Sequence, residues 1–395
     1  EMLERQFSLN DTPLEEMFLP FKSDLDYFKL NIMECRNCSH VCLDYLVPVD
    51  QTYSKYLYLS ETTTGLKQHY KEYADEISLK YLTALAPKVC DIGCNDGSML
   101  EAFSLDHGVI IGVEPAPKAC EIARRKGFDV RSGYFDAEMS ASLLADYGYF
   151  NIITSNYMFA NIPDLHEFVR NIRAMMDAEG VWVVQTGYHI NQFQLGMFDY
   201  VYHEHIHYFT LRSFEKLLAY HQLECIDAKL VPEMKGGSIR LVVAKVGAFE
   251  RSSSVHEVLV DEESLASNYL KDSFQLFAQN KKSFTHIFKK IKSQYDKVLF
   301  FGASHSCTTL LFYYELQATD ITCIIDDNEI KQGLFSPGLN IRVRAPESID
   351  FTQSKILVIL GSWQHAETIM MRHSLLDCDW LVPLPEVRYL RAMKR

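Results

Sequence analysis

Residues 88–187 alternate between short apolar runs and stretches in which apolar residues recur at helical spacing. KVCDIG (88–93) and VIIGVEP (109–115) have the composition of buried strands, and KACEIARRKG (118–127) has an amphipathic helical pattern. Alternation of this kind favours a parallel sheet with helices on both faces. The sequence therefore predicts an α/β protein with a Rossmann-like core.

A second α/β pattern begins with KVLFFGAS (297–304) and continues through DITCIIDDN (320–328) and KILVILGSW (355–363). A chain of 395 residues is longer than one core usually serves, so two or three domains are expected. A charged stretch with helical spacing separates the two patterns. We expect a small N-terminal domain, the core, a helical linker and a second Rossmann-like unit, at 1–60, 61–250, 251–295 and 296–395.

Composition narrows the classes of partner. The formal net charge of −13 argues against a nucleic-acid binder, which would normally show a basic face, but it leaves room for an anionic small molecule. No apolar run reaches membrane-spanning length, and no signal peptide is visible. The ten cysteines are scattered, many of them in apolar contexts, which indicates a reduced, cytoplasmic protein. The oligomeric state stays open.

The stretch DIGCNDGSML (91–100) joins a predicted strand to a predicted helix. Gly93 and Gly97 let the backbone turn tightly and approach a ligand closely. Asp91 and Asp96 would repel a pyrophosphate, so the loop differs from a dinucleotide fingerprint. It suits a cationic, phosphate-free cofactor such as S-adenosylmethionine, with Asn95 inside the same contact loop.

Three residues after later strands extend this cofactor prediction. Glu114 lies 21 positions after Gly93, where a carboxylate can accept both ribose hydroxyls. We expect Asp136 to reach the adenine edge and Asn156 to face the reaction centre. The alternative is an α/β turn that binds no ligand.

The segment YVYHEHIHYFT (200–210) concentrates proton-handling side chains. If it is extended, His203, His205 and His207 share one side and could ligate zinc. A turn would break that alternation and let Glu204 and His205 converge. The third possibility is a polar loop packed by aromatic residues. We favour catalysis, because histidine titrates nearest neutral pH.

Methyl transfer to oxygen or nitrogen needs little base, whereas transfer to carbon needs a carbanion. The substrate must lose a C–H proton beside a carbonyl, and the enolate oxygen must be stabilised. In this segment a histidine would take the proton and a tyrosine would donate a hydrogen bond to the enolate. The glutamate would orient the imidazole or the substrate.

Motifs along almost the whole chain resemble one family, the sugar C-methyltransferases that act on nucleotide-linked 4-keto-6-deoxy sugars. The matching stretches are ECRNC, YLYLSETT, CDIGCNDGS, GVEPA, NIPDLHEFV, YHEHIHYFTLRS, KGGSIR, IDDNEIKQGLFSPG and VILGSW, of which YHEH is the most specific. The resemblance implies a zinc-binding N-terminal domain, a methyltransferase core and a C-terminal Rossmann-like domain that helps hold the nucleotide sugar.

The resemblance also assigns residues. It makes Tyr202, Glu204 and His205 the catalytic group, with His205 as the base that removes the proton from sugar carbon 3. Further substrate contacts are implied at Tyr56 or Tyr58, at His203, at Gly237, Ser238 and Arg240 of GGSIR, and at Lys331. Two positions depart from the family's frequent histidine. With Asn161 in place of a histidine, no second histidine at that position can share the role of base with His205. Lys235 suits an anionic group.

Two further sites are incomplete in the sequence. FFGASHSC has one glycine where a dinucleotide loop needs three, so NAD is not expected. Ser304 and His305 could still meet a phosphate at a helix N-terminus, or the unit could dock without contacting a ligand.

Cys35 and Cys38 form one CxxC, which is half of a structural zinc site. We expect a second pair upstream of Glu1, since the chain begins without Met. The alternatives are completion by His40 or Cys42, or loss of the site.

The expected function is S-adenosylmethionine-dependent methylation of carbon 3 of a nucleotide-linked 4-keto-6-deoxy sugar. One rival uses the same mechanism on another ketone or at sugar carbon 5. The other is a non-catalytic module that binds a nucleotide sugar.

Overall fold

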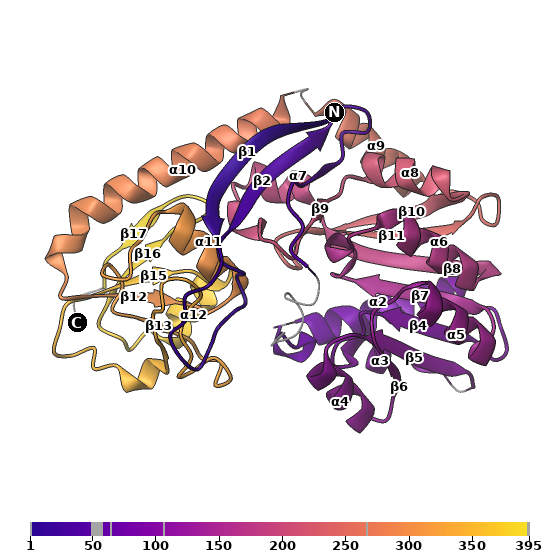
Figure 1. The fold of residues 1–395 in the computed structure, drawn as a ribbon, viewed down its shortest axis with the longest axis horizontal. Helices are drawn as coiled ribbons and strands as arrows, with labels where there is room; N and C mark the ends of the chain where they lie inside the picture. Colours follow the sequence, from indigo (N-terminus) through magenta and orange to yellow (C-terminus); the bar gives the residue numbers. More distant parts are fainter. Residues whose placement is uncertain (1, 49–57, 64, 106, 266–267, 393–395) are drawn as a thin grey trace.

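The computed structural model describes residues 2–48, 58–63, 65–105, 107–265 and 268–392. Tyr56, one of the two tyrosines expected at the substrate, lies outside these residues. The chain forms three sheets (Figure 1), and the central and C-terminal sheets are flanked by helices. Among the described helices, none combines the length and the apolar character needed to span a membrane.

The central sheet has seven strands in the order β10-β11-β8-β7-β4-β5-β6. Its strands are β4 (Lys88–Ile92), β5 (Val109–Glu114), β6 (Asp129–Ser132), β7 (Phe150–Asn156), β8 (Met176–Gly187), β10 (Leu223–Val231) and β11 (Ser238–Lys245). The strands from β6 to β8 run parallel, whereas β11 is antiparallel to both of its neighbours. Strand order reverses at β4, which opens a crevice at the carboxyl ends of β4 and β7.

Both faces of this sheet are covered, which explains the continuous apolar run in β8. Trp182 and Val184 pack into one core and Val181 and Val183 into another, so successive side chains point to opposite, equally buried faces. The surrounding helices are α2 (Leu66–Tyr81), α3 (Ser98–Ala102), α4 (Pro117–Arg125), α5 (Ala137–Tyr147), α6 (Leu165–Met175), α7 (His189–Gln194) and α8 (Leu211–Tyr220).

The N-terminal sheet is antiparallel and contains β1 (Leu3–Thr12), β2 (Phe28–Cys35), β3 (Val41–Leu43) and β9 (His207–Tyr208). Strand β9 belongs to the histidine-rich segment and pairs with β3, where the amide of Leu43 donates to the carbonyl of Ile206 at 2.9 Å. The N-terminal sheet therefore holds this segment directly at the core.

The C-terminal sheet is mixed, with the order β14-β13-β12-β15-β16-β17. It contains β12 (Lys297–Phe301), β13 (Cys323–Ile325), β14 (Val343–Arg344), β15 (Ile356–Leu360), β16 (Asp379–Val382) and β17 (Arg388–Leu390), with helices α11 (His305–Tyr313) and α12 (Ala366–Arg372). All pairs are parallel except β16 with β17. The predicted second α/β unit is present, with an antiparallel edge that the sequence pattern did not indicate.

The expected linker forms α9 (Ser253–Ser264) and α10 (Tyr269–Ile291). Helix α10 runs along the molecule from the core to the C-terminal unit (Figure 1). Its phenylalanines Phe274, Phe277, Phe284 and Phe288 are buried in a core shared with β1 and α11. This segment is thus part of a packed core, not an exposed connection. Short 3-10 turns complete the fold at Ser60–Thr62 (η1), Phe159–Asn161 (η2), Phe198–Tyr200 (η3), Lys292–Gln294 (η4), Pro346–Ser348 (η5) and Trp363–His365 (η6).

Candidate active site

A cavity of about 430 Å³ lies at the carboxyl edge of the central sheet, where a ligand is expected in an open α/β fold. Several parts of the chain line it: the loop after β4, the end of β5, residues 133–135 and 156–164, the histidine-rich segment, Lys235 and His305. The cavity therefore brings the predicted cofactor loop and the predicted catalytic segment together.

At the cofactor end, backbone donors fix the carboxylate of Glu114. Its Oε2 accepts the amide of Asn95 at 2.9 Å and its Oε1 accepts the amide of Ala116 at 2.8 Å. Gly93 has φ of +75°, and a Cβ there would come within 2.8 Å of Met158 Cγ. The chain needs glycine at this position for both reasons.

The charge at this end favours a cation. Asp91 and Glu114 both line the cavity, and burial raises the pKa of Asp91 to about 7 and also raises that of Glu114. A buried acidic pair would repel a pyrophosphate and fits a sulfonium cofactor. The predicted residues that line this end are Asp91, Gly93, Asn95, Glu114 and Asn156.

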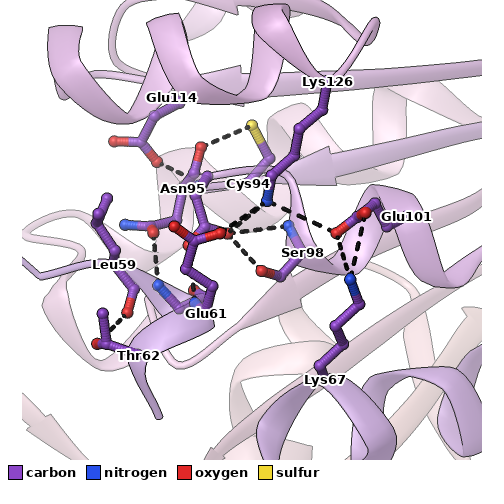
Figure 2. A network of polar contacts seen from close by, with 12 residues as sticks. Leu59, Glu61, Thr62, Lys67, Cys94, Asn95, Ser98, Glu101, Glu114 and Lys126 are labelled. Carbon is purple, nitrogen blue, oxygen red and sulfur yellow. Dashed lines mark hydrogen bonds and ion pairs between the residues drawn. The ribbon is translucent and has the colours of Figure 1, made fainter.

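Asp96 and Gly97 lie outside the cavity lining, which corrects their assignment as cofactor contacts. The fully buried carboxylate of Asp96 accepts the amide of Glu61 at 2.8 Å and the amide of Ser98 at 3.0 Å. Gly97, at φ of +81°, is the N-cap of α3. Figure 2 shows the same network, in which Asn95 contacts Glu114. These residues shape the glycine loop and tie it to η1.

Asp136 is also corrected. Its exposed carboxylate caps α5 by accepting the amide of Met139 at 2.8 Å, so it does not face the cavity. The two preceding residues, Tyr134 and Phe135, line the cavity instead. Sequence reasoning missed them because an N-cap aspartate and a base-binding aspartate look alike before the backbone is known.

The histidine-rich segment adopts a turn at Tyr202–His205, and is therefore not the extended strand that would place its three histidines on one side. The amide of His205 donates to the carbonyl of Tyr202 at 3.0 Å. The imidazole of His205 lies with Nδ1 3.2 Å from the carbonyl oxygen of Tyr200 and Nε2 2.8 Å from Tyr202 Oη. Because the carbonyl can only accept, Nδ1 carries the proton and Nε2 accepts the hydroxyl.

The ring of His205 is neutral over the whole range near pH 7. Burial, together with the nearby cationic groups His305 and Lys235, lowers the pKa of His205 to about 3, although the hydrogen bond to Tyr200 opposes the shift. Both Tyr202 and His205 line the cavity. The structure thus presents a neutral imidazole, the form a general base requires.

Glu204 lines the same cavity but does not orient the imidazole of His205. Its Oε1 lies 3.2 Å from Nε2 of His305, the first residue of α11. The carbonyl of Tyr200 orients His205 instead. Glu204 was expected to orient either the imidazole or the substrate. Because it does not contact His205, orientation of the substrate remains as its expected role.

The two other histidines of the segment have different partners. Nδ1 of His203 contacts Glu15 Oε1 at 2.9 Å and Nε2 faces the carbonyl of Lys29 at 3.3 Å, so this side chain lies outside the cavity lining. That placement corrects its assignment to the substrate. His207 lines the cavity and contacts His40, with Nδ1 3.0 Å from Nε2. In the part of the chain that the structure describes, no three His, Cys, Asp or Glu residues are grouped to hold a metal ion.

Cys35 ends β2 and Cys38 lies in the turn that follows, and all ten cysteines are free thiols. His40 directs its ring to His207, and burial raises the pKa of the Cys42 thiol to about 11. Among the described residues, neither His40 nor Cys42 belongs to a group of three possible metal ligands, whereas a structural zinc site needs four.

Lys235 supplies a cation to the cavity. Its Nζ donates to Tyr58 Oη at 2.7 Å and lies 4.2 Å and 4.8 Å from the ring centroids of Tyr58 and Tyr157. It forms no ion pair with any carboxylate among the described residues. Tyr58 and Asn161 line the same space. An ammonium held by two aromatic faces is available to an anionic ligand.

The remaining residues predicted at the substrate fall outside the cavity lining, and their contact with a substrate stays a prediction. Ser238 Oγ donates to the carbonyl of Val231 at 3.3 Å, and the carbonyl of Gly237 accepts the amide of Tyr188 at 3.2 Å. Arg240 pairs with Glu76 at 2.6 Å. Lys331 pairs with Glu16 and Ser304 is the N-cap of α11. These side chains hold the fold together around the cavity.

Comparisons with known proteins agree with this architecture. Residues 66–228 match a methyltransferase domain family, and residues 233–385 match the family described as C-methyltransferase C-terminal domain. The C-methyltransferase NovU of Streptomyces niveus is 26% identical over 395 residues, which cover 98% of this chain and 94% of NovU. The ubiquinone biosynthesis O-methyltransferase of Bordetella avium is 29% identical over 98 residues, covering 24% of this chain and 40% of that protein.

Among solved structures, an S-adenosylmethionine-dependent methyltransferase from Clostridium acetobutylicum has 13% identity and a TM-score of 0.36, over 46% of this chain and 92% of its own.

The glycine loop, its acidic lining and the two family matches define the chain as an S-adenosylmethionine-dependent methyltransferase. The match over 233–385 and the similarity to NovU along almost the whole chain narrow this class to enzymes that methylate carbon. The chain belongs to the S-adenosylmethionine-dependent C-methyltransferase family. The rival interpretation of a non-catalytic module is thereby set aside.

Proposed function

We propose that the protein methylates carbon 3 of a nucleotide-linked 4-keto-6-deoxy sugar. The observation that carries the proposal is the Tyr202–His205 hydrogen bond, which places a neutral imidazole in the cavity that also contains Glu114. Methylation at carbon requires a base, and this cavity contains one. The similarity to a C-methyltransferase over nearly the whole chain supports the choice of carbon.

In the proposed reaction, Tyr202 turns its hydroxyl from Nε2 of His205 to the carbonyl oxygen of the substrate. Nε2 then has a free lone pair and accepts the proton from the carbon beside the carbonyl. The C–H electron pair moves onto the carbonyl oxygen, where the Tyr202 hydroxyl stabilises it. S-adenosylmethionine, when bound, supplies the electrophilic methyl group. Asp91, Asn95 and Glu114 would hold that cofactor.

The ammonium of Lys235 supports the choice of an anionic substrate. An ammonium without a carboxylate partner among the described side chains favours a ligand that carries negative charge, as the diphosphate of a nucleotide sugar does. A different ketone, or methylation at sugar carbon 5, would use the same base and the same lysine. The site therefore supports the reaction type more directly than the position on the sugar.

Exchange with solvent tests the proposal without methyl transfer. The protein is incubated with a nucleotide-linked 4-keto-6-deoxy sugar in deuterated water, without methyl donor, and deuterium is located by NMR. We expect incorporation at carbon 3 with the wild-type protein and none with His205→Asn. His203→Asn is the matched control, since His203 lies outside the cavity, and it should keep the exchange. Bound sugar without exchange would refute the proposal.

A further inference from the structure

Four charges of alternating sign, three of them buried and His305 partly buried, run from the C-terminal unit to the cavity. Lys331 pairs with Glu16, Glu16 Oε2 lies 3.4 Å from Nδ1 of His305, and Nε2 of His305 lies 3.2 Å from Glu204 Oε1. Glu16, Glu204 and Lys331 are all less than 9% exposed. The series joins the loop after β1, the C-terminal unit and the histidine-rich segment.

The geometry defines the charge of His305. Both ring nitrogens face a carboxylate oxygen, so both carry protons and the ring is an imidazolium. Burial opposes that charge, but Glu16 and Glu204 outweigh it and raise the pKa of His305 to about 9. Tyr202 lies against the same ring, with centroids 5.1 Å apart, and Lys331 and His205 are two further titratable groups that interact with it.

The far end of the series is the carboxylate of Glu204. His305 lies against Oε1, and Glu204 lines the cavity. A carboxylate anchored through one oxygen can accept a hydroxyl in a defined position through the other. A sugar presents such hydroxyls.

We propose that His305 is a positioning residue that fixes Glu204 as the acceptor of a substrate hydroxyl. This inference rests on the proposed function, because it takes the substrate to be a sugar. It gives the C-terminal unit a part in the reaction, since His305 is the first residue of α11. Misplacement of Glu204 would weaken binding of the sugar and misalign the carbon with the base.

The protein supplies a control for this inference one residue earlier in the chain. Glu15 pairs with His203 at 2.9 Å, and both side chains are buried away from the cavity. Glu15→Gln and Glu16→Gln therefore each remove a carboxylate of the same loop from a histidine, His203 of the histidine-rich segment in the first case and His305 of α11 in the second. Only the second change reaches Glu204.

The experiment compares wild type, Glu15→Gln and Glu16→Gln by pH profile, by KM and kcat, and by calorimetric binding of the nucleotide sugar. For Glu16→Gln we expect a loss of kcat/KM for the sugar on the order of tenfold to a hundredfold, with the KM for S-adenosylmethionine unchanged. The basic limb of the profile, where the imidazolium loses its proton, should move to lower pH by about one unit or more, because a carboxylate that stabilised the cation is gone. Glu15→Gln should leave that limb in place.

Three results decide the matter. Equal basic limbs and equal sugar binding in Glu16→Gln and wild type would overturn the inference. If the wild type binds the sugar without exchange or methylation, the proposed reaction fails, whereas weaker binding by Glu16→Gln would still support the role of His305. Should Glu16→Gln fail to fold, His305→Lys replaces it. Lysine keeps its charge to higher pH than histidine, so His305→Lys should keep sugar binding and move the basic limb of the pH profile upward. A basic limb that stays near pH 9 in this variant would refute the assignment of that limb to His305.

Discussion

Tyr202 Oη lies 2.8 Å from Nε2 of His205, while the carbonyl of Tyr200 holds the opposite ring nitrogen at 3.2 Å. The imidazole is therefore oriented by the backbone of its own turn, and its lone pair is shielded by a hydroxyl that can swing toward a ligand. In the proposed reaction, this arrangement assigns proton removal to His205 and stabilisation of the developing oxyanion to Tyr202.

Replacement of Tyr202 by Phe separates those duties experimentally. The imidazole keeps its bond to Tyr200 and its lone pair is exposed, so proton abstraction retains its base but loses the enolate donor. We expect kcat for methyl transfer to fall by about a hundredfold to a thousandfold, the usual cost of one lost oxyanion donor. Steady-state kinetics with the nucleotide sugar measure the loss. A variant with wild-type kcat would show that the hydroxyl has no part in the reaction.

The low pKa of His205 predicts an unusual acid limb. The active base is the neutral ring, so activity is present above its pKa and is lost as pH falls through it, which for the free enzyme is about 3. An anionic substrate would stabilise the protonated ring and raise that pKa in the complex. The acid limb of kcat/KM should therefore lie below pH 5, and that of kcat should lie higher. Deuterium exchange measured between pH 4 and 8 checks this. A limb of kcat/KM near 6.5 would contradict it.

Glu114→Gln tests the cofactor end. The substitution keeps the shape of the side chain but removes a charged acceptor, which costs about 1.5–3 kcal/mol, or roughly ten to a hundredfold in affinity for S-adenosylhomocysteine. Isothermal calorimetry measures the affinity. Asp136→Ala is the control, because that carboxylate caps α5. It should lower thermal stability by the cost of a helix cap, about 1 kcal/mol, and leave the affinity unchanged.

Lys235→Met tests the anionic subsite. Loss of the ammonium should weaken nucleotide-sugar binding by about tenfold or more, with no change in S-adenosylhomocysteine affinity. Lys229→Met removes an equal charge from a surface pair with Glu76 and should change neither. Equal losses in the two variants would mean that the effect comes from net charge, not from the contact inside the cavity.

Local patterns in the sequence predicted the parts of the site that depend on short-range geometry. Gly93 and Glu114 follow directly from a strand, a tight turn and the next strand, so their spacing is sufficient to place them. In each case the partner lies within one βαβ unit.

The side chains that the sequence placed at the cavity but the structure places elsewhere depend on contacts between distant segments. His203 is only two residues before His205, but the turn between them directs the ring of His203 to Glu15. The spacing of residues in the sequence does not predict this direction. Glu16 was missed because its partners, His305 and Lys331, belong to the last unit of the chain. Arg240 was assigned to the substrate from a motif, although its strand directs it to Glu76 on α2.

The short β3–β9 pairing has a consequence for anyone who would reduce this enzyme to a minimal catalyst. The core sheet carries the cofactor loop, yet the strand that follows His205 is hydrogen-bonded to residues 41–43 of the opening hairpin. A truncated version that began at α2 would keep a cofactor loop while leaving its proton acceptor unanchored. Removal of the N-terminal sheet would also uncover the apolar core that β1 shares with α10 and α11.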